Sequence, residues 1–98
     1  MLEHYVQLIV ELQNKQPAIL PARKFIPVDI TLFNGNITLK SFVIINISGR
    51  RITGLTQQEQ YTAPRENREP VYSSFGLDEI KCLYCAELDI DYKHPGLD

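Results

Sequence analysis

Residues 26–54 read IPVDITLFNGNITLKSFVIINISGRRITG and carry the clearest pattern in the chain. Every second residue from position 28 to position 32 is apolar, which is typical of a strand with one buried face. Asn34-Gly35 follows, and both residues tolerate the positive φ that a two-residue type I′ turn requires. The stretch therefore predicts a β-hairpin that reverses at Asn34-Gly35.

The residues on either side of this turn also predict how the two strands pair. Each matched cross-strand pair adds only about 0.2–1 kcal/mol, but a one-residue slip would set apolar residues opposite polar ones. We therefore expect a single register, with Phe33 and Asn36 flanking the turn. Its pairs are Leu32 with Ile37, Thr31 with Thr38, Ile30 with Leu39, and Asp29 with Lys40.

The second strand continues through an apolar run from Phe42 to Ile47, where the alternation is lost. Either both faces of the strand are buried there, or a β-bulge shifts the phase of the pattern. Ser48-Gly49 then predicts a turn. A long strand that bends in this way can serve both halves of a small barrel.

The remaining segments complete a mainly β domain that spans residues 1–98. Apolar residues at helical spacing predict an N-terminal helix over 2–14. A connector, 15–25, leads to a small, strongly bent, antiparallel five-stranded barrel over 26–88. The other expected segments are a short edge strand at 18–20, strands at 51–55, 71–75 and 80–88, a long polar loop at 56–70, and an acidic tail at 89–98 that frays.

Composition limits the class of protein. The 98 residues suffice for one domain with its own core, and no stretch reaches the ~20 apolar residues of a membrane span. No secretory signal precedes the helix, and two cysteines do not make a disulfide framework. We therefore expect a cytoplasmic protein that does not contact the membrane.

Charge is unevenly distributed along the chain, although the net charge is only −2. Residues 15–68 hold eight Lys or Arg against three acidic residues, whereas residues 69–98 hold two against seven. A basic middle segment is compatible with an anionic ligand. It is equally compatible with a surface on which the two halves neutralise each other.

No catalytic or metal-binding pattern stands out. Cys82-x-x-Cys85 lies within an expected strand, where residues three apart point to opposite faces, and structural zinc usually needs a second such pair. The paired carboxylates, Asp78-Glu79 and Asp89 with Asp91, come without a companion base or nucleophile. We therefore expect neither an enzyme nor a bound metal or cofactor.

The best binding candidate is the Arg50-Arg51 pair beyond the expected turn. Guanidinium groups bind phosphate bidentately, and a neighbouring amide or hydroxyl can contact a base edge or a ribose. A charged turn after a buried strand explains the same residues without a ligand. The full set of expected ligand-binding residues is Arg50, Arg51, Asn46, Ser48, Arg65, Arg68 and Tyr61.

Two family resemblances add to this interpretation. The leading helix followed by PVDITLFNGNITL resembles the opening of Hfq and other Sm-like proteins, with matches at Pro27, Val28, Ile30, Leu32, Asn34, Gly35 and Leu39. This resemblance implies a ring-forming, Sm-like or SH3-like barrel that binds RNA. Arg23, Asn46 and Ser48 also resemble the motif of PilZ domains, which bind cyclic di-GMP, and stand at roughly the spacing of that family. The resemblance implies a cyclic-nucleotide sensor or, because the motif is degenerate in this sequence, a protein-interaction role.

Taken together, these patterns predict a non-catalytic binding module that forms a homo-oligomer. Its expected ligand is RNA or another anion, contacted through an arginine-rich rim. The alternatives are a protein-interaction or scaffolding module without nucleic acid, and a PilZ-like nucleotide sensor.

Overall fold

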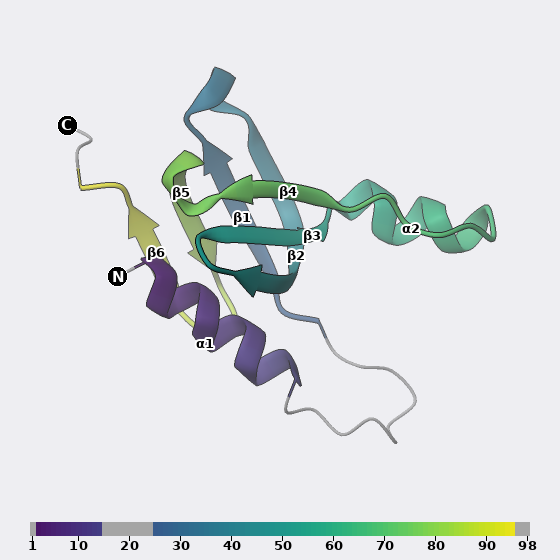
Figure 1. Cartoon of the computed structure of the whole chain (residues 1–98), viewed down its shortest axis with the longest axis horizontal. Helices are drawn as coiled ribbons and strands as arrows, with labels where there is room; N and C mark the ends of the chain where they lie inside the picture. Colours follow the sequence, from purple (N-terminus) through teal and green to yellow (C-terminus); the bar gives the residue numbers. More distant parts are fainter. Residues whose placement is uncertain (1, 15–24, 96–98) are drawn as a thin grey trace.

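The computed structural model describes residues 2–14 and 25–95, arranged as an N-terminal helix against a bent antiparallel sheet (Figure 1). The elements are α1 (Leu2–Asn14), β1 (Pro27–Leu32), η1 (Asn34–Asn36), β2 (Thr38–Ser48), β3 (Arg51–Leu55), α2 (Gln57–Arg65), β4 (Ser73–Gly76), η2 (Leu77–Glu79), β5 (Ile80–Cys85) and β6 (Ile90–Lys93). The expected helix over 2–14 is confirmed. The expected edge strand at 18–20, and most of the connector 15–25, lie outside the described residues.

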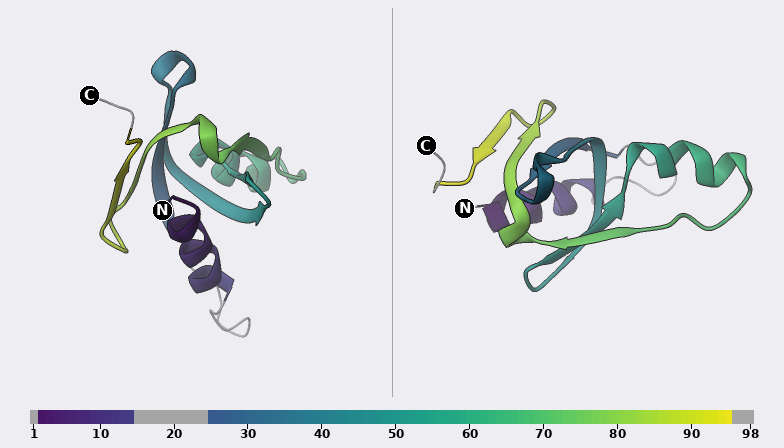
Figure 2. Two further views of the ribbon diagram at one scale, coloured as in Figure 1. Left: turned by 60° about the vertical axis from the view of Figure 1, so that its left-hand side comes forward. Right: turned by 90° about the horizontal axis from the view of Figure 1, so that it is seen from above.

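The sheet has six strands in the order β4-β3-β2-β1-β5-β6, so the expectation of a closed five-stranded barrel is wrong. The sheet bends strongly, and η2 carries the chain from β4 to β5 (Figure 2). β4 and β5 are nevertheless not paired, because β4 bonds only to β3 and the far side of β5 is taken by β6. The described sheet therefore keeps two open edges, β4 and β6.

The central hairpin has the expected register close to its turn. Ile30 faces Leu39 and Thr31 faces Thr38, whose hydroxyl oxygens lie 3.1 Å apart. The turn is not the expected type I′ turn. Positive φ occurs at Gly35 and Asn36 and not at Asn34, and η1 occupies the turn. The backbone N–H of Phe33 donates to Glu79 O at 3.0 Å, and Phe33 O accepts a long hydrogen bond of 3.5 Å from the Asn36 N–H.

Bulges at both ends explain the apolar run in β2. The pairing shifts between Val28 and Ile30, so that Asp29 faces both Lys40 and Ser41. The carboxylate of Asp29 accepts the Ser41 N–H at 3.0 Å, so a bulge replaces the expected one-to-one pairing of Asp29 with Lys40. The pairing with β3 shifts again beyond Ile44. Between the two shifts three consecutive residues are buried, so both explanations of the run hold.

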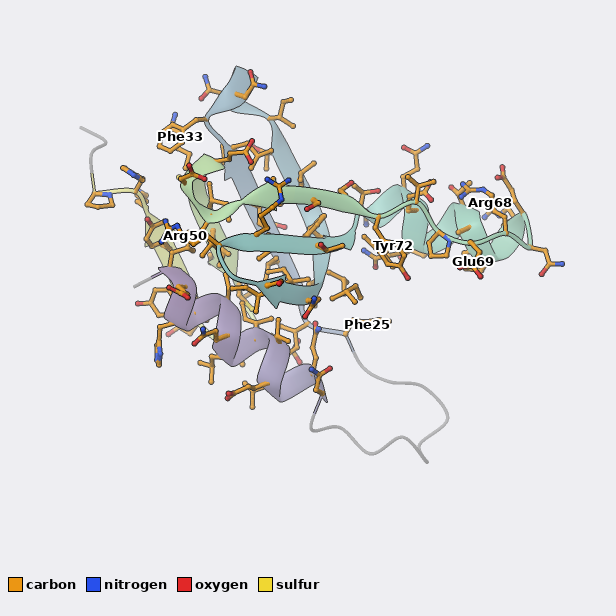
Figure 3. All side chains as sticks on the ribbon, viewed as in Figure 1. Phe25, Phe33, Arg50, Arg68, Glu69 and Tyr72 are labelled. Carbon is orange, nitrogen blue, oxygen red and sulfur yellow. The ribbon has the colours of Figure 1, made fainter. Side chains whose placement is uncertain are left out.

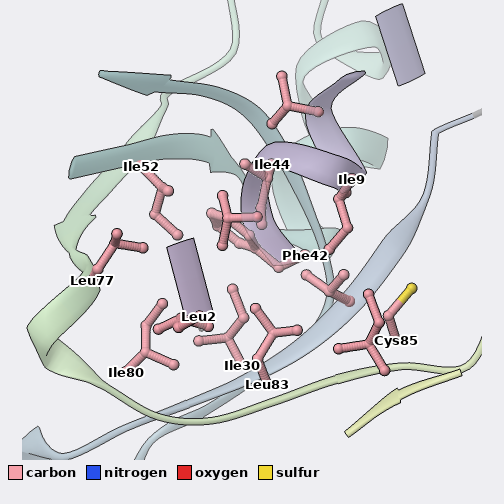
Figure 4. Close-up of a cluster of buried hydrophobic side chains, with 14 of the residues drawn as sticks. Leu2, Ile9, Ile30, Phe42, Ile44, Ile52, Leu77, Ile80, Leu83 and Cys85 are labelled. Carbon is pink, nitrogen blue, oxygen red and sulfur yellow. The ribbon is translucent and has the colours of Figure 1, made fainter. Parts of the chain in front are cut away.

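The hydrophobic core lies between the inner face of the sheet and α1 (Figure 4). Val6 and Ile9 of α1 are fully buried against it, and Phe42 packs its ring 5.5 Å from that of Phe75. A Cβ on Gly54 would lie 2.6 Å from the Phe42 ring, so only glycine allows this close approach. The large apolar side chains of the central strands thus pack on one side of the sheet.

One buried polar side chain joins the helix to the sheet. Gln13, at the end of α1, is 3% exposed. Its amide nitrogen donates to Ile44 O, and its amide oxygen accepts the Ile26 N–H, both at 2.8 Å. Because both ends of the amide are bonded, the side chain fixes α1 over β2 without leaving a buried polar atom unpaired.

Residues 56–70 are not the long loop that their polarity suggests, because α2 occupies most of them. Thr56 caps this helix, its hydroxyl accepting the Glu59 N–H at 3.3 Å. The Gln60 amide nitrogen donates to Ser41 O at 2.9 Å and to Leu55 O at 3.1 Å. Polar contacts therefore secure a helix that has little apolar pattern of its own.

The end of the chain also departs from the expectation. β4 begins at Ser73, two residues later than expected, and the strand expected over 80–88 ends at Cys85. The expectation that the tail over 89–98 frays is wrong for its described part, because Ile90 is buried and β6 pairs with β5 along its length; residues 96–98 lie outside the described residues. Buried Ile90 and half-buried Tyr92 alternate with exposed Asp91 and Lys93, which gives this short strand one core-facing side.

Candidate functional site

The structure does not bring the expected arginines together. Arg50 and Arg51 lie at the turn between β2 and β3, whereas Arg65 and Arg68 lie at the far end of α2 (Figure 3). The molecule measures 43 × 27 × 24 Å, and these two groups occupy opposite ends of it. The arginine-rich rim is therefore two separate surfaces.

The first surface is a polar face on β2, β3 and β4. Asn46 and Ser48 lie on the same side of β2, directly opposite Thr53 and Arg51 of β3. Ser74 of β4 extends the row, and its hydroxyl accepts a long hydrogen bond of 3.4 Å from Arg51 Nε. Three of the expected binding residues, Asn46, Ser48 and Arg51, therefore lie together on this face. Arg51 is the one cation in the row.

Arg50 does not join that row. It lines a hollow of about 230 Å³ together with residues from the start of α1, from η2 and from the end of β6. The carboxylates of Glu3 and Asp78 line the same hollow. An anion entering it would therefore meet negative charge as well as the guanidinium, which weakens Arg50 as an anion site.

The second surface is the α2 arm, which we define as residues 56–72. It comprises α2 and the segment that returns beside it to β4, and it projects from the body of the molecule (Figures 1 and 2). Arg68 in the returning segment meets Glu59 in the first turn of α2 through two parallel hydrogen bonds, Nη1–Oε1 at 2.9 Å and Nη2–Oε2 at 3.1 Å. This bidentate pair closes the arm.

Further contacts occupy the remaining groups of this pair. Arg68 Nε donates to Glu66 at 2.6 Å, and Glu59 Oε1 accepts the Val71 N–H at 2.8 Å. Arg68 and the Val71 N–H hold the pKa of Glu59 down at about 2, and Glu59 with Glu66 raises the pKa of Arg68. Arg68 was an expected ligand-binding residue, but its donors are engaged within the arm.

A groove runs along one side of the arm, with a volume of about 410 Å³. We call it the arm groove. Its wall is mostly apolar and is formed by side chains from the start of β1, the end of β3, α2 and the returning segment. The lining residues are Phe25, Leu55, Glu59, Gln60, Tyr61, Ala63, Pro64, Arg68 and Pro70.

The polar groups in the arm groove are largely satisfied by the protein itself. The Gln60 amide nitrogen is bonded to two backbone carbonyls, and Glu59 is bonded to Arg68 and to a backbone N–H. Groups that already hold good partners gain little from a polar ligand, because a new contact replaces an existing one. The arm groove therefore favours an apolar ligand over a charged one.

The arm groove continues toward the tip of the arm. A second hollow, of about 370 Å³, shares Pro64, Arg68 and Pro70 with it and is also lined by Asn67 and Glu69. The Glu69 carboxylate has no hydrogen-bond or ion-pair partner within residues 2–14 and 25–95. The two neighbouring hollows, together called the depression, thus have an apolar part near the body and an acidic group near the tip.

The cysteines and the paired carboxylates do not form a site in the described structure. Cys82 and Cys85 are free thiols on β5, the first half-buried and the second buried. Asp89 lies in the turn before β6 and so does not share a strand face with Asp91. Within the described ranges no group of three or more His, Cys, Asp or Glu is placed to hold a metal ion. Nor does this part of the chain contain a helix long and apolar enough to cross a membrane.

Comparisons with known proteins provide no further guide to the site. No family model, no curated protein and no solved structure matches the chain. Sequence reasoning selected Tyr61, Arg65 and Arg68 but missed the arm groove, because its wall comes from segments as distant as Phe25 and Pro70. The signal that could have revealed α2 is Thr56-Gln-Gln-Glu59, the spacing of an N-terminal capping box.

Proposed function

We propose that this protein is a non-catalytic protein-interaction module that holds an apolar side chain of a protein partner in the arm groove. The observation that carries the proposal is a groove of about 410 Å³ with a mostly apolar wall and internally bonded polar groups. Pockets of this size and character usually bind ligands through buried apolar area, with few polar contacts.

The distribution of exposed apolar side chains supports this choice. Eight large apolar side chains in the described ranges are exposed, and four of them lie on the arm or at the mouth of the groove. These are Phe25, Tyr61, Val71 and Tyr72, with exposed fractions between 43% and 67%. Aromatic side chains at the edge of an apolar depression are typical of the centre of a protein interface.

A peptide-display selection tests the proposal with a matched pair of variants. Wild-type protein is used to select from a library of random peptides, and the enriched peptides are then measured against Tyr61→Ser and Tyr84→Ser. Tyr84 is 48% exposed on β5 and does not line the arm groove, so it controls for the loss of any exposed tyrosine.

We expect enriched peptides to carry aliphatic or aromatic residues. Tyr61→Ser should weaken their binding at least about tenfold, as for the loss of an aromatic anchor. Tyr84→Ser should leave binding unchanged. Enriched peptides that lose equal affinity in both variants, or that are acidic without apolar residues, would show that the arm groove is not the binding surface.

A second candidate is the binding of RNA or another anion at the polar face. The observation in its favour is the row formed by Asn46, Ser48, Arg51, Thr53 and Ser74 on three adjacent strands. RNA contact through this face would fit the Sm-like resemblance, and a mononucleotide there would fit the PilZ-like one. Binding of a random RNA pool should then weaken steeply with added salt and should depend on Arg51 but not on Tyr61.

A further inference from the structure

We infer that the partner held in the arm groove is a second copy of this chain, and that the two copies pair through their arms about a twofold axis. The inference rests on the proposed function, because it names the occupant of the same groove. It is carried by the match between the groove and the outer surface of the arm itself.

The depression sets two requirements for its occupant. The part near Leu55 and Ala63 calls for an apolar side chain, because its polar neighbours are already bonded. The part near the tip holds the Glu69 carboxylate, which has no partner among the described residues. An occupant with an apolar anchor and a positive charge a short distance away would satisfy both parts.

The exposed surface of α2 carries this combination. Tyr61 is 67% exposed, and Arg65 is exposed without a hydrogen-bond or ion-pair partner in residues 2–14 and 25–95. The two residues are four apart in the helix, so they lie on the same side, one turn from each other. Tyr61 would supply the apolar side chain, and Arg65 would supply the positive charge that the depression requires of its occupant.

The position of Tyr61 favours a symmetric arrangement. Tyr61 forms part of the wall of the groove on its own chain while most of its ring faces solvent. In a twofold contact the same patch on both copies must be self-complementary, so an anchor beside its own receiving groove is the suitable arrangement. Tyr61 of each copy then enters the arm groove of the other, and Arg65 of each copy approaches the other's Glu69.

Sedimentation equilibrium of the full chain over a range of concentrations tests this arrangement through a charge swap. Arg65→Glu and Glu69→Arg each place like charges together at two symmetric positions, whereas the double variant restores opposite charges. We expect wild type to dimerise and each single variant to weaken the dimer by roughly threefold or more. The double variant should recover most of that loss.

Two further variants separate the anchor from general surface effects. Tyr61→Ser should weaken the dimer at least about tenfold, whereas Tyr84→Ser should not change it. Lys93→Glu reverses an exposed charge on β6, away from the arm, and should also leave the dimer intact. Circular dichroism of every variant confirms that the fold is retained.

The outcomes distinguish this inference from the proposed function. A monomer at all concentrations, or a dimer that Tyr61→Ser does not weaken, overturns the inference. If that monomer still captures apolar peptides in a Tyr61-dependent way, the proposed function stands and the partner is another protein. Absence of both self-association and Tyr61-dependent peptide binding overturns both.

Discussion

The body of the molecule and the α2 arm are held together by different forces. In the body, sixteen buried residues form one apolar cluster: four come from α1, eleven from the strands and η2, and one, Ile26, lies just before β1. Ala63 of the arm and Val43 of β2 are also buried but do not belong to that cluster. The arm relies on a helix cap, the Gln60 contacts and the Glu59–Arg68 pair.

Because of this difference, the proposed binding surface on the arm could change without loss of the folded body. The body gains its stability from apolar burial, which is large and insensitive to individual surface residues. The arm gains its shape from a few polar contacts that are individually small. Substitutions in the arm should therefore change the structural order of the arm, and the binding proposed for it, while the body stays folded.

The largest expected effect comes from the body. Phe42→Ala removes a fully buried ring that contacts Phe75 and lies over Gly54. Because it leaves a cavity in a close-packed core, we expect a loss of about 3–5 kcal/mol in the free energy of unfolding. Urea denaturation followed by circular dichroism measures it.

Phe33→Ala is the matched control for that change. Phe33 is 40% exposed at the tip of the central hairpin, so its removal should cost well under half as much. Equal losses of unfolding free energy for the two variants would contradict the view that burial of Phe42 in the core is what stabilises the body.

A smaller effect, confined to the arm, is expected for Thr56→Ala. The change removes the hydroxyl that accepts the Glu59 N–H and should destabilise α2 by about 1 kcal/mol. Amide hydrogen exchange in α2 should accelerate roughly fivefold, while the urea midpoint of the body barely moves. Thr38→Ala removes an exposed hydroxyl on β2 and should leave α2 exchange as it is.

The smallest effect is expected when the pH is lowered until Glu59 becomes protonated. The folded-state pKa of Glu59 is about 2, below its usual 4.5, because Arg68 and the Val71 N–H bond the carboxylate. Its contribution to the order of the arm is therefore complete above about pH 4.5 and is lost as the pH falls through about 2. A carboxyl-carbon NMR titration should show that low midpoint.

Arg68→Ala provides the comparison for this titration, and the Glu59 midpoint should then rise toward its usual value. A midpoint above 4 in the wild type would show that the Glu59–Arg68 pair does not persist in solution. In that event the arm would lack the contact that closes it.

The sequence predicted the body far better than the arm, for a physical reason. Ile30, Leu32 and Leu39 lie on one face of the hairpin. Their apolar alternation predicts the strands, and packing of the same side chains stabilises the hairpin. The sequence offered a bulge as one explanation of the apolar run but not its position at Lys40–Ser41, where the Asp29 carboxylate accepts a backbone N–H across the hairpin.

The sequence of the arm contains fewer features that predict its structure. α2 reads QQEQYTAPR, with one buried residue and an internal proline, so composition favours a loop. Its order depends on contacts between Glu59, Arg68 and Val71, which become visible only when the returning segment is placed beside the helix. Of the expected binding residues only Tyr61 and Arg68 line the arm groove, which could not be foreseen from residue type alone.

The most direct test of the difference between body and arm is native-state hydrogen exchange over a series of low urea concentrations. The amides of Gln60, Glu66 and Arg68 are hydrogen-bonded within the arm. We predict measurable protection at these amides, with an opening free energy below that of β1, β2 and β5 and reduced further by Arg68→Ala. Arm amides that exchange as fast as an unfolded chain, or that open only with the whole body, would contradict the account.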